Sequence, residues 1–285
     1  MAAINDAGNR AGPIWDTHVH LFPEKMMQAI FRFFREQYGW QLPFSANPDR
    51  LLEYLREQGI CRVFALAYVH KPNLSRQVNR WLAELADRYP WVVPFGAVHP
   101  LDDELGAVVR EALDLYGFAG LKLHCLVQQI RPDDRRLDPV YQALTERGRG
   151  LIIHASSFPL PAENYLGISY VSRLMQNHPG LKMVVPHLGL YDLQGYRHLL
   201  DLYPDLYLDT AFVFQNRGLI PPLREIKELL LAFPNRVLYG SDYPFILEPP
   251  QNGISRIKEL KLPASIDRQL FFANAAKFLS DLAGK

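Results

Sequence analysis

The sequence predicts a (β/α)8 TIM barrel, in which eight parallel strands form a closed sheet with helices between successive strands. Eight short apolar runs rich in β-branched residues recur along the 285 residues, and each is followed by a polar residue. Segments with helical spacing of apolar residues separate these runs. Because alternation of this kind in one chain is typical of the barrel, we expect a single domain over residues 14–285. Residues 1–13 are polar and contain glycine, which predicts a disordered N-terminal arm.

The expected strands lie at 14–20, 61–70, 91–99, 118–124, 150–156, 181–187, 205–211 and 236–242. The segment 78–85 between the second and third runs carries apolar residues at i, i+3, i+4 and i+7, which predicts an outer helix. Asp138 followed by Pro139 indicates a helix start, because aspartate caps helices and proline is favoured at the first helical position.

The connection from the first strand to the second is longer than a barrel requires. It holds an aromatic-rich helical segment at 26–40 and a second helical stretch at 49–58, which together predict a helical insertion beside the barrel mouth. The aromatic residues could belong to the core, a lid or a homodimer surface. We favour the core because aromatic residues on helices are usually buried. These residues are Phe31, Phe33, Phe34, Tyr38 and Trp40.

The composition favours a small-molecule partner. Thirty-one basic residues nearly balance thirty acidic ones, for a net charge of +1. The chain therefore has no general electrostatic attraction to nucleic acid or to an anionic membrane surface. The chain has no secretory signal pattern and no apolar run of about 18 residues that could span a bilayer. Its two cysteines, Cys61 and Cys125, form neither a disulfide framework nor a zinc module. We therefore expect reduced thiols and a cytoplasmic location.

Polar residues gather where a TIM barrel places its active site. Catalytic groups in this fold come from the carboxyl ends of the strands. Seven of the nine histidines and one aspartate lie at the ends of the expected strands: His18, His20, His70, His99, His124, His154, His187 and Asp242. Structural histidines would be scattered along the chain, so this distribution indicates a functional site.

His18 and His20 are two residues apart on one strand, so both side chains point to the same face and form a chelating pair. His154 and Asp242 could complete the ligand set of one divalent metal ion and leave a position for water. Zinc is the first choice and manganese the second. Such an ion lowers the pKa of its water toward neutrality and supplies a hydroxide nucleophile.

Several motifs resemble those of the amidohydrolase superfamily, and most closely its amidohydrolase-related family of metal-dependent hydrolases and nonoxidative decarboxylases. The resemblance covers nearly the whole chain, and its most specific motifs are the last two. The motifs are DTHVHLFP at 16–23, GFAGLKLH at 117–124, LDPVYQALTERGRGLIIHASS at 137–157, VVPHLG at 184–189, RVLYGSDYPF at 236–245 and FFANAAKFL at 271–279.

By this resemblance, His18, His20 and His154 are metal ligands, and Asp242 both binds the metal and accepts a proton from its water. His187 is implied to orient or deprotonate that water, or to polarise a substrate oxygen. The set of residues describes a site for one metal ion.

Four further residues are expected to contact the substrate. Lys122 and His124 share one face of the fourth strand and could bind a carboxylate or oxyanion. Some superfamily members instead carry a carboxylated lysine that bridges two metals, and this alternative stays open for Lys122. His70 and His99 are placed at the same rim. Asp209, at the end of the seventh strand, could accept a hydrogen bond from the second nitrogen of a ligand histidine.

The leading functional hypothesis is hydrolysis of an ester, lactone or amide of a small carboxylated metabolite. The alternative is nonoxidative decarboxylation of an aromatic or unsaturated acid at the same metal. Deoxyribonuclease activity is disfavoured, because barrels of that kind typically carry glutamate where this chain has His99. A non-enzymatic binding protein is the alternative of a different class. It predicts that one of the metal ligands is missing, and none is missing from the sequence.

Overall fold

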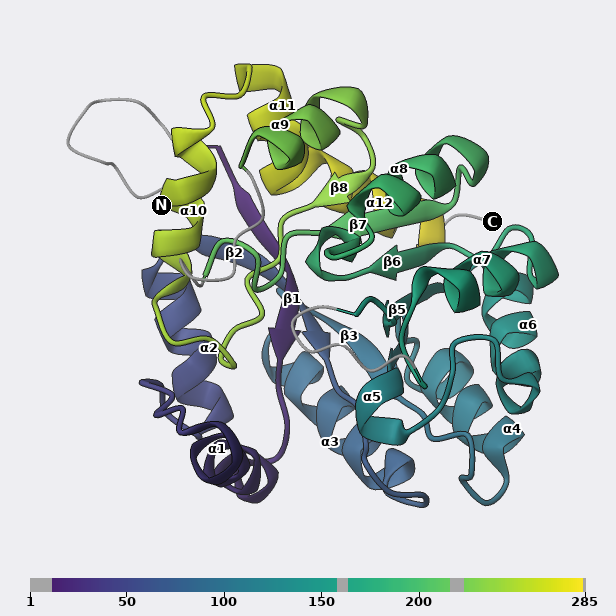
Figure 1. Cartoon of the computed structure of the whole chain (residues 1–285). Helices are drawn as coiled ribbons and strands as arrows, with labels where there is room; N and C mark the ends of the chain where they lie inside the picture. Colours follow the sequence, from purple (N-terminus) through teal and green to yellow (C-terminus); the bar gives the residue numbers. More distant parts are fainter. Residues whose placement is uncertain (1–11, 158–163, 216–222, 284–285) are drawn as a thin grey trace.

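A computed structural model describes residues 12–157, 164–215 and 223–283 (Figure 1). The predicted arm at 1–13 lies outside these residues except for its last two. Eight parallel strands form one sheet in chain order, which confirms the predicted TIM barrel. The strands are β1 (Ile14–His20), β2 (Ile60–Leu66), β3 (Val92–Ala97), β4 (Gly120–His124), β5 (Gly150–His154), β6 (Met183–Val185), β7 (Leu206–Asp209) and β8 (Val237–Leu238).

Backbone hydrogen bonds close the sheet between β1 and the segment that follows β8. The Thr17 amide donates to the Tyr239 carbonyl at 2.9 Å, and the His20 amide donates to the Tyr243 carbonyl at 2.8 Å. In the opposite direction, the Asp242 amide donates to the His18 carbonyl at 3.0 Å. The first strand and the last loop therefore lie side by side at the carboxyl end of the barrel.

Helices surround the sheet and connect successive strands (Figure 1). The α-helices are α1 (Glu24–Tyr38), α2 (Pro48–Glu57), α3 (Ser75–Arg88), α4 (Leu105–Arg110), α5 (Cys125–Gln128), α6 (Asp138–Glu146), α7 (Ile168–Asn177), α8 (Leu193–Leu202), α9 (Leu223–Ala232), α10 (Pro250–Glu259), α11 (Ala264–Arg268) and α12 (Asn274–Ala283). Short 3-10 or π turns lie at 111–115, 135–137, 187–189 and 269–273. None of the helices in the described ranges is long and apolar enough to cross a membrane.

Two helices, α1 and α2, lie between β1 and β2, and α1 is placed beyond the carboxyl end of β1 (Figure 1). The aromatic side chains of this connection divide into two groups. The Phe34 ring lies 5.2 Å from that of Phe245, and the Trp40 ring stacks 5.8 Å from that of Phe212. Phe33 and Tyr38 are 50% and 44% exposed. One group therefore packs on the loops after β7 and β8, and the other faces solvent.

The strands differ in length from the sequence-based expectation. β1 has the predicted bounds, but the prediction that every site residue ends a strand is wrong for four of them. His70, His99, His187 and Asp242 lie in the loops after β2, β3, β6 and β8. His187 and Asp242 have φ angles of 61° and 75°, in the left-handed region, so the chain cannot continue as a strand through either residue.

Gly120, at the start of β4, lies where the neighbouring strand leaves no room for a side chain. A Cβ atom on Gly120 would lie 2.0 Å from the carbonyl oxygen of Gly150 on the neighbouring strand. Because backbone cannot move aside cheaply, Gly120→Ala is expected to lower the free energy of unfolding by about 3 kcal/mol, measured by urea denaturation. Gly106→Ala is the control, since its nearest neighbour is the flexible end of Arg110 at 3.5 Å. Equal stability of the two variants would contradict the packing described.

Candidate metal centre

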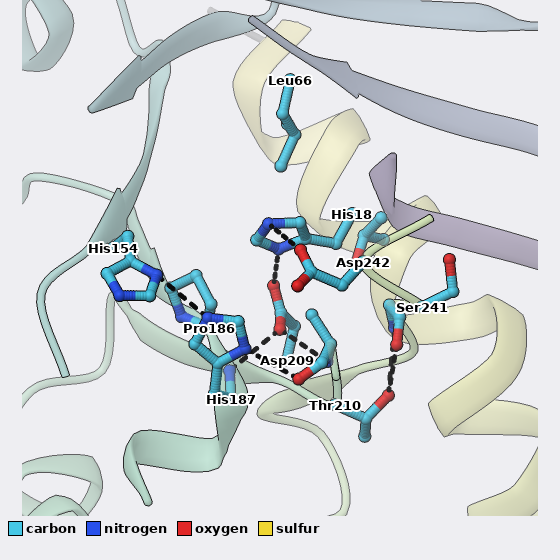
Figure 2. A network of polar contacts seen from close by, with 12 residues as sticks. His18, Leu66, His154, Pro186, His187, Asp209, Thr210, Ser241 and Asp242 are labelled. Atoms are coloured by element: carbon cyan, nitrogen blue, oxygen red, sulfur yellow. Dashed lines mark hydrogen bonds and ion pairs between the residues drawn. The ribbon is translucent and has the colours of Figure 1, made fainter. Parts of the chain in front are cut away.

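Two histidines of β1 converge with Asp242 from the loop after β8. One ligand atom from each of His18, His20 and Asp242 lies within 4.8 Å of the others, and all three side chains are buried. Asp242 Oδ1 is 3.3 Å from His18 Nε2 and 3.1 Å from His20 Nε2. Asp242 lies beside His18 in Figure 2. We call these three residues the metal triad.

The protonation states of the metal triad suit a divalent cation. Burial lowers the pKa of His20 and lowers that of His18 well below its usual value, so both imidazoles are neutral. Burial opposes ionisation of Asp242, but its short contacts with His20 Nε2 and His18 Nε2 outweigh burial and hold the Asp242 pKa below its usual value. Neutral imidazoles and an ionised carboxylate are the forms that bind zinc or manganese, so the residues fit such an ion.

Asp209 fixes the orientation of His18. Its Oδ2 accepts a hydrogen bond from His18 Nδ1 at 2.7 Å, and its Oδ1 accepts from the backbone amides of His187 and Ala211 at 3.2 and 2.9 Å. Figure 2 shows Asp209 between His18 and His187. With the proton on Nδ1, His18 Nε2 keeps a lone pair on the side of His20 and Asp242, where it can bind a metal. The hydrogen bond expected from the sequence is present.

His154 and His187 form a second hydrogen-bonded pair beside the triad (Figure 2). A carbonyl can only accept, so His187 Nδ1 donates to the Ala211 carbonyl at 2.8 Å. In its neutral form, His187 then accepts at Nε2 from His154 Nδ1, at 3.0 Å. This assignment leaves His154 Nε2 without a proton. His154 can therefore act as a ligand, although it is not one of the three residues within 4.8 Å.

Six aromatic rings form a closed circuit around the centre, each in contact with the next. We call it the ring circuit. Five members are histidines and one is a tyrosine. The centroid distances are 4.9 Å for His18–His20, 5.4 Å for His20–Tyr68, 4.8 Å for Tyr68–His124, 4.1 Å for His124–His154, 4.8 Å for His154–His187 and 5.9 Å for His187–His18.

Lys122 and His124, the substrate-binding candidates of β4, both lie at this centre. Lys122 is fully buried, and its Nζ is 3.4 Å from His18 Nε2. Burial lowers its pKa to about 8, against the opposing effect of Asp209 and Asp242. The buried Nδ1 of His124 has no hydrogen-bond partner among the described residues. Both side chains are therefore placed to meet a ligand next to the metal triad.

His70 and His99 are placed differently. His70 is exposed, while His99 is buried and accepts a hydrogen bond at Nδ1 from the Leu101 amide at 3.2 Å. Across the described ranges, neither histidine has a hydrogen bond or ring contact with the metal triad. Tyr68, two residues before His70, occupies that side of the centre instead. Tyr68 is not among the residues predicted from the sequence, because the second apolar run predicts a strand that continues to residue 70 and draws attention to the histidine at its end.

Three solved structures have a similar fold. The first is an uncharacterised TIM-barrel protein from Bordetella bronchiseptica, and the second is a 5-carboxyvanillate decarboxylase from Novosphingobium aromaticivorans in complex with manganese and 4-hydroxy-3-methoxy-5-nitrobenzoic acid. The third is a protein from Pseudomonas putida whose assignment as a 2-pyrone-4,6-dicarboxylic acid hydrolase is provisional. Their sequence identities to the chain are 21%, 19% and 18%, and their TM-scores are 0.73, 0.67 and 0.67. The matches cover 95%, 94% and 94% of this chain and 100%, 96% and 98% of the others.

No curated protein sequence matches the chain significantly. A sequence model of the amidohydrolase family, in contrast, matches residues 15–280. That span contains all eight strands except the first residue of β1, and it contains every residue of the metal triad and the ring circuit. The chain therefore belongs to the amidohydrolase family.

Proposed function

We propose that the protein is a metal-dependent hydrolase that cleaves an ester, lactone or amide of a small carboxylated metabolite. The observation that carries this proposal is the metal triad, in which two neutral imidazoles and one ionised carboxylate bring their ligand atoms within 4.8 Å of one another. The left-handed backbone of Asp242 and His187 supports it, because non-glycine residues held in this conformation cluster at functional sites.

His18, His20 and Asp242 would hold the ion, with His154 Nε2 as a fourth ligand. A divalent ion bound there supplies Lewis-acid polarisation of a carbonyl and a water of lowered pKa. The carboxylate of Asp242 takes a proton from the attacking water and delivers it to the leaving group. Lys122 and His124 hold the substrate carboxylate or the developing oxyanion. His187 orients His154 through their hydrogen bond. Manganese is the alternative to zinc, because the decarboxylase of similar fold is bound to manganese.

Nonoxidative decarboxylation of an aromatic or unsaturated acid is the second candidate. It is favoured by the stacking of Phe245 on His20, at 4.9 Å between centroids and 20° between planes, which places an aromatic surface next to the metal triad. The decarboxylase of similar fold, which holds a hydroxylated nitrobenzoic acid, supports the same reading. In this reaction, loss of carbon dioxide follows protonation of the ring.

Metal content tests both versions. Protein purified without chelator is expected to hold about one equivalent of zinc or manganese by elemental mass spectrometry, and His18→Ala is expected to lose most of it because one ligand is gone. His198→Ala is the control, since His198 is exposed on α8. Two equivalents would place a carboxylated Lys122 in a two-metal site. Failure of the unmutated protein to retain either metal, even after both are supplied, would refute the proposal.

The reaction type is read from the products. Lactones, esters, amides and carboxylated aromatic acids are offered to the metal-loaded protein, and proton release and carbon dioxide are measured in parallel. Net consumption of water with release of an acid identifies the hydrolase. Carbon dioxide release without net water consumption identifies the decarboxylase and excludes the preferred version.

A further inference from the structure

Tyr68 is the one member of the ring circuit that is not a histidine. It lies two residues past the end of β2, and its ring meets both His20 of the metal triad and His124 of β4 edge-on or tilted. On its other side it packs against Phe22, 5.2 Å away at 87°. Its side chain is partly exposed, so the position is accessible to a ligand that enters the barrel mouth.

The polar atoms at this position lack protein partners. Within the part of the chain that the structure describes, the Tyr68 hydroxyl makes no hydrogen bond, and neither does the buried Nδ1 of the adjacent His124. Phenylalanine would pack against Phe22 and the two histidines as well as tyrosine does. A buried nitrogen without a partner costs free energy, so the Nδ1 of His124 indicates a missing polar ligand, and the partly exposed Tyr68 hydroxyl is available to meet the same ligand.

The groups at this position define what that ligand offers. A tyrosine hydroxyl carries a proton at neutral pH and can donate it. The fully buried Lys122 lies two residues before His124 on β4. Donors and a positive charge on one side of the metal triad select an anionic oxygen.

We propose that Tyr68 and His124 form an oxygen-binding subsite beside the metal triad, in which the Tyr68 hydroxyl donates a hydrogen bond to the carboxylate of the bound substrate. This inference rests on the proposed function, since it takes the metal triad as the place where the substrate reacts. It assigns Tyr68 to substrate binding and defines the substrate class as small carboxylates whose acid group reaches the edge of the β2 loop.

The test measures binding and needs no turnover. The probe is 4-hydroxy-3-methoxy-5-nitrobenzoic acid, titrated calorimetrically into zinc-loaded protein. Tyr68→Phe is expected to weaken binding by about 10-fold, the value of one hydrogen bond to a charged group. The matched control is Tyr116→Phe, because Tyr116 is also partly exposed and its hydroxyl makes no hydrogen bond among the described residues, but it precedes β4 at the opposite end of the barrel. This control is expected to bind as the unmutated protein does.

The methyl ester of the probe identifies the oxygen involved. If the carboxylate is the acceptor, Tyr68→Phe and the unmutated protein bind the ester with nearly equal affinity. The same loss for acid and ester would contradict the carboxylate assignment. Equal affinity of Tyr68→Phe and the unmutated protein for the acid, or no binding of the acid to the unmutated protein, would overturn the subsite.

Metal content separates this inference from the proposed function. If the protein holds metal but Tyr68→Phe binds the acid normally, the subsite is wrong and the metal-dependent function stands. If the protein holds no metal, the proposed function fails, and the same titration of metal-free protein still decides whether Tyr68 contacts the carboxylate.

Discussion

Asp242→Asn is expected to lower kcat by about 10²–10⁴-fold at saturating metal, the usual contribution of a positioned general acid–base group. The carboxylate is the only acidic member of the metal triad, and its lowered pKa keeps it ionised, which is the form that can accept a proton and bind a cation. An amide of the same size keeps the packing but neither accepts that proton nor binds a cation as strongly. Initial rates with the best ester or lactone, measured over a range of zinc concentrations, provide the test.

Asp192→Asn is the matched control for Asp242→Asn. Asp192 immediately precedes α8, is partly buried, and its carboxylate takes no part in the metal triad. Its variant is expected to keep full activity. If Asp242→Asn retained more than about a tenth of the kcat of the unmutated protein with excess zinc, Asp242 would not be the proton acceptor.

Asp209→Asn is expected to keep the fold and lose about 10–100-fold in metal affinity. The amide oxygen can still accept from the backbone of His187 and Ala211. The amide nitrogen, however, donates toward His18 Nδ1, where the carboxylate accepted at 2.7 Å. His18 Nδ1 must then be the acceptor, and the ring proton moves to Nε2, which can no longer bind a metal. Calorimetric zinc titration and thermal unfolding separate the two effects.

The matched control is Asp138→Asn. Asp138 accepts from His178 Nε2 at 3.0 Å in a second histidine–carboxylate pair away from the metal triad. This variant is expected to bind zinc normally. Unchanged zinc affinity in Asp209→Asn would show that the tautomer of His18 does not depend on its carboxylate partner.

The barrel could be predicted from the sequence because the spacing of apolar runs reports the strands directly. Both ends of β1 agree with the prediction, because its alternating pattern ends where the chain leaves the sheet. The ends of β6 and β8 were predicted too late. There, left-handed residues such as His187 and Asp242 end the strand, and tertiary contacts, not local residue preferences, hold them in that conformation.

The metal triad was predictable because ligating residue types are rare and its two histidines share one face of a strand. Tyr68 was not, since a tyrosine near a strand end is most often core, and only the structure shows its hydroxyl without a partner. The role of Asp209 could be predicted in part. Its position at the end of β7 suggests a partner for a ligand histidine, but only the structure shows that it also accepts hydrogen bonds from two backbone amides.

The backbone hydrogen bonds between β1 and the loop after β8 form a seam between distant parts of the chain, and an ion held by the metal triad would bridge this seam. His20 and Asp242 are 222 residues apart, and closing a flexible loop of that length costs about 5 kcal/mol in chain entropy. An ion that binds only the closed seam, at about 100 times its dissociation constant, returns about 2.7 kcal/mol of that cost. His20 and Asp242 meet only where β1 lies beside the loop after β8, so the complete metal triad exists only when this end of the barrel has closed.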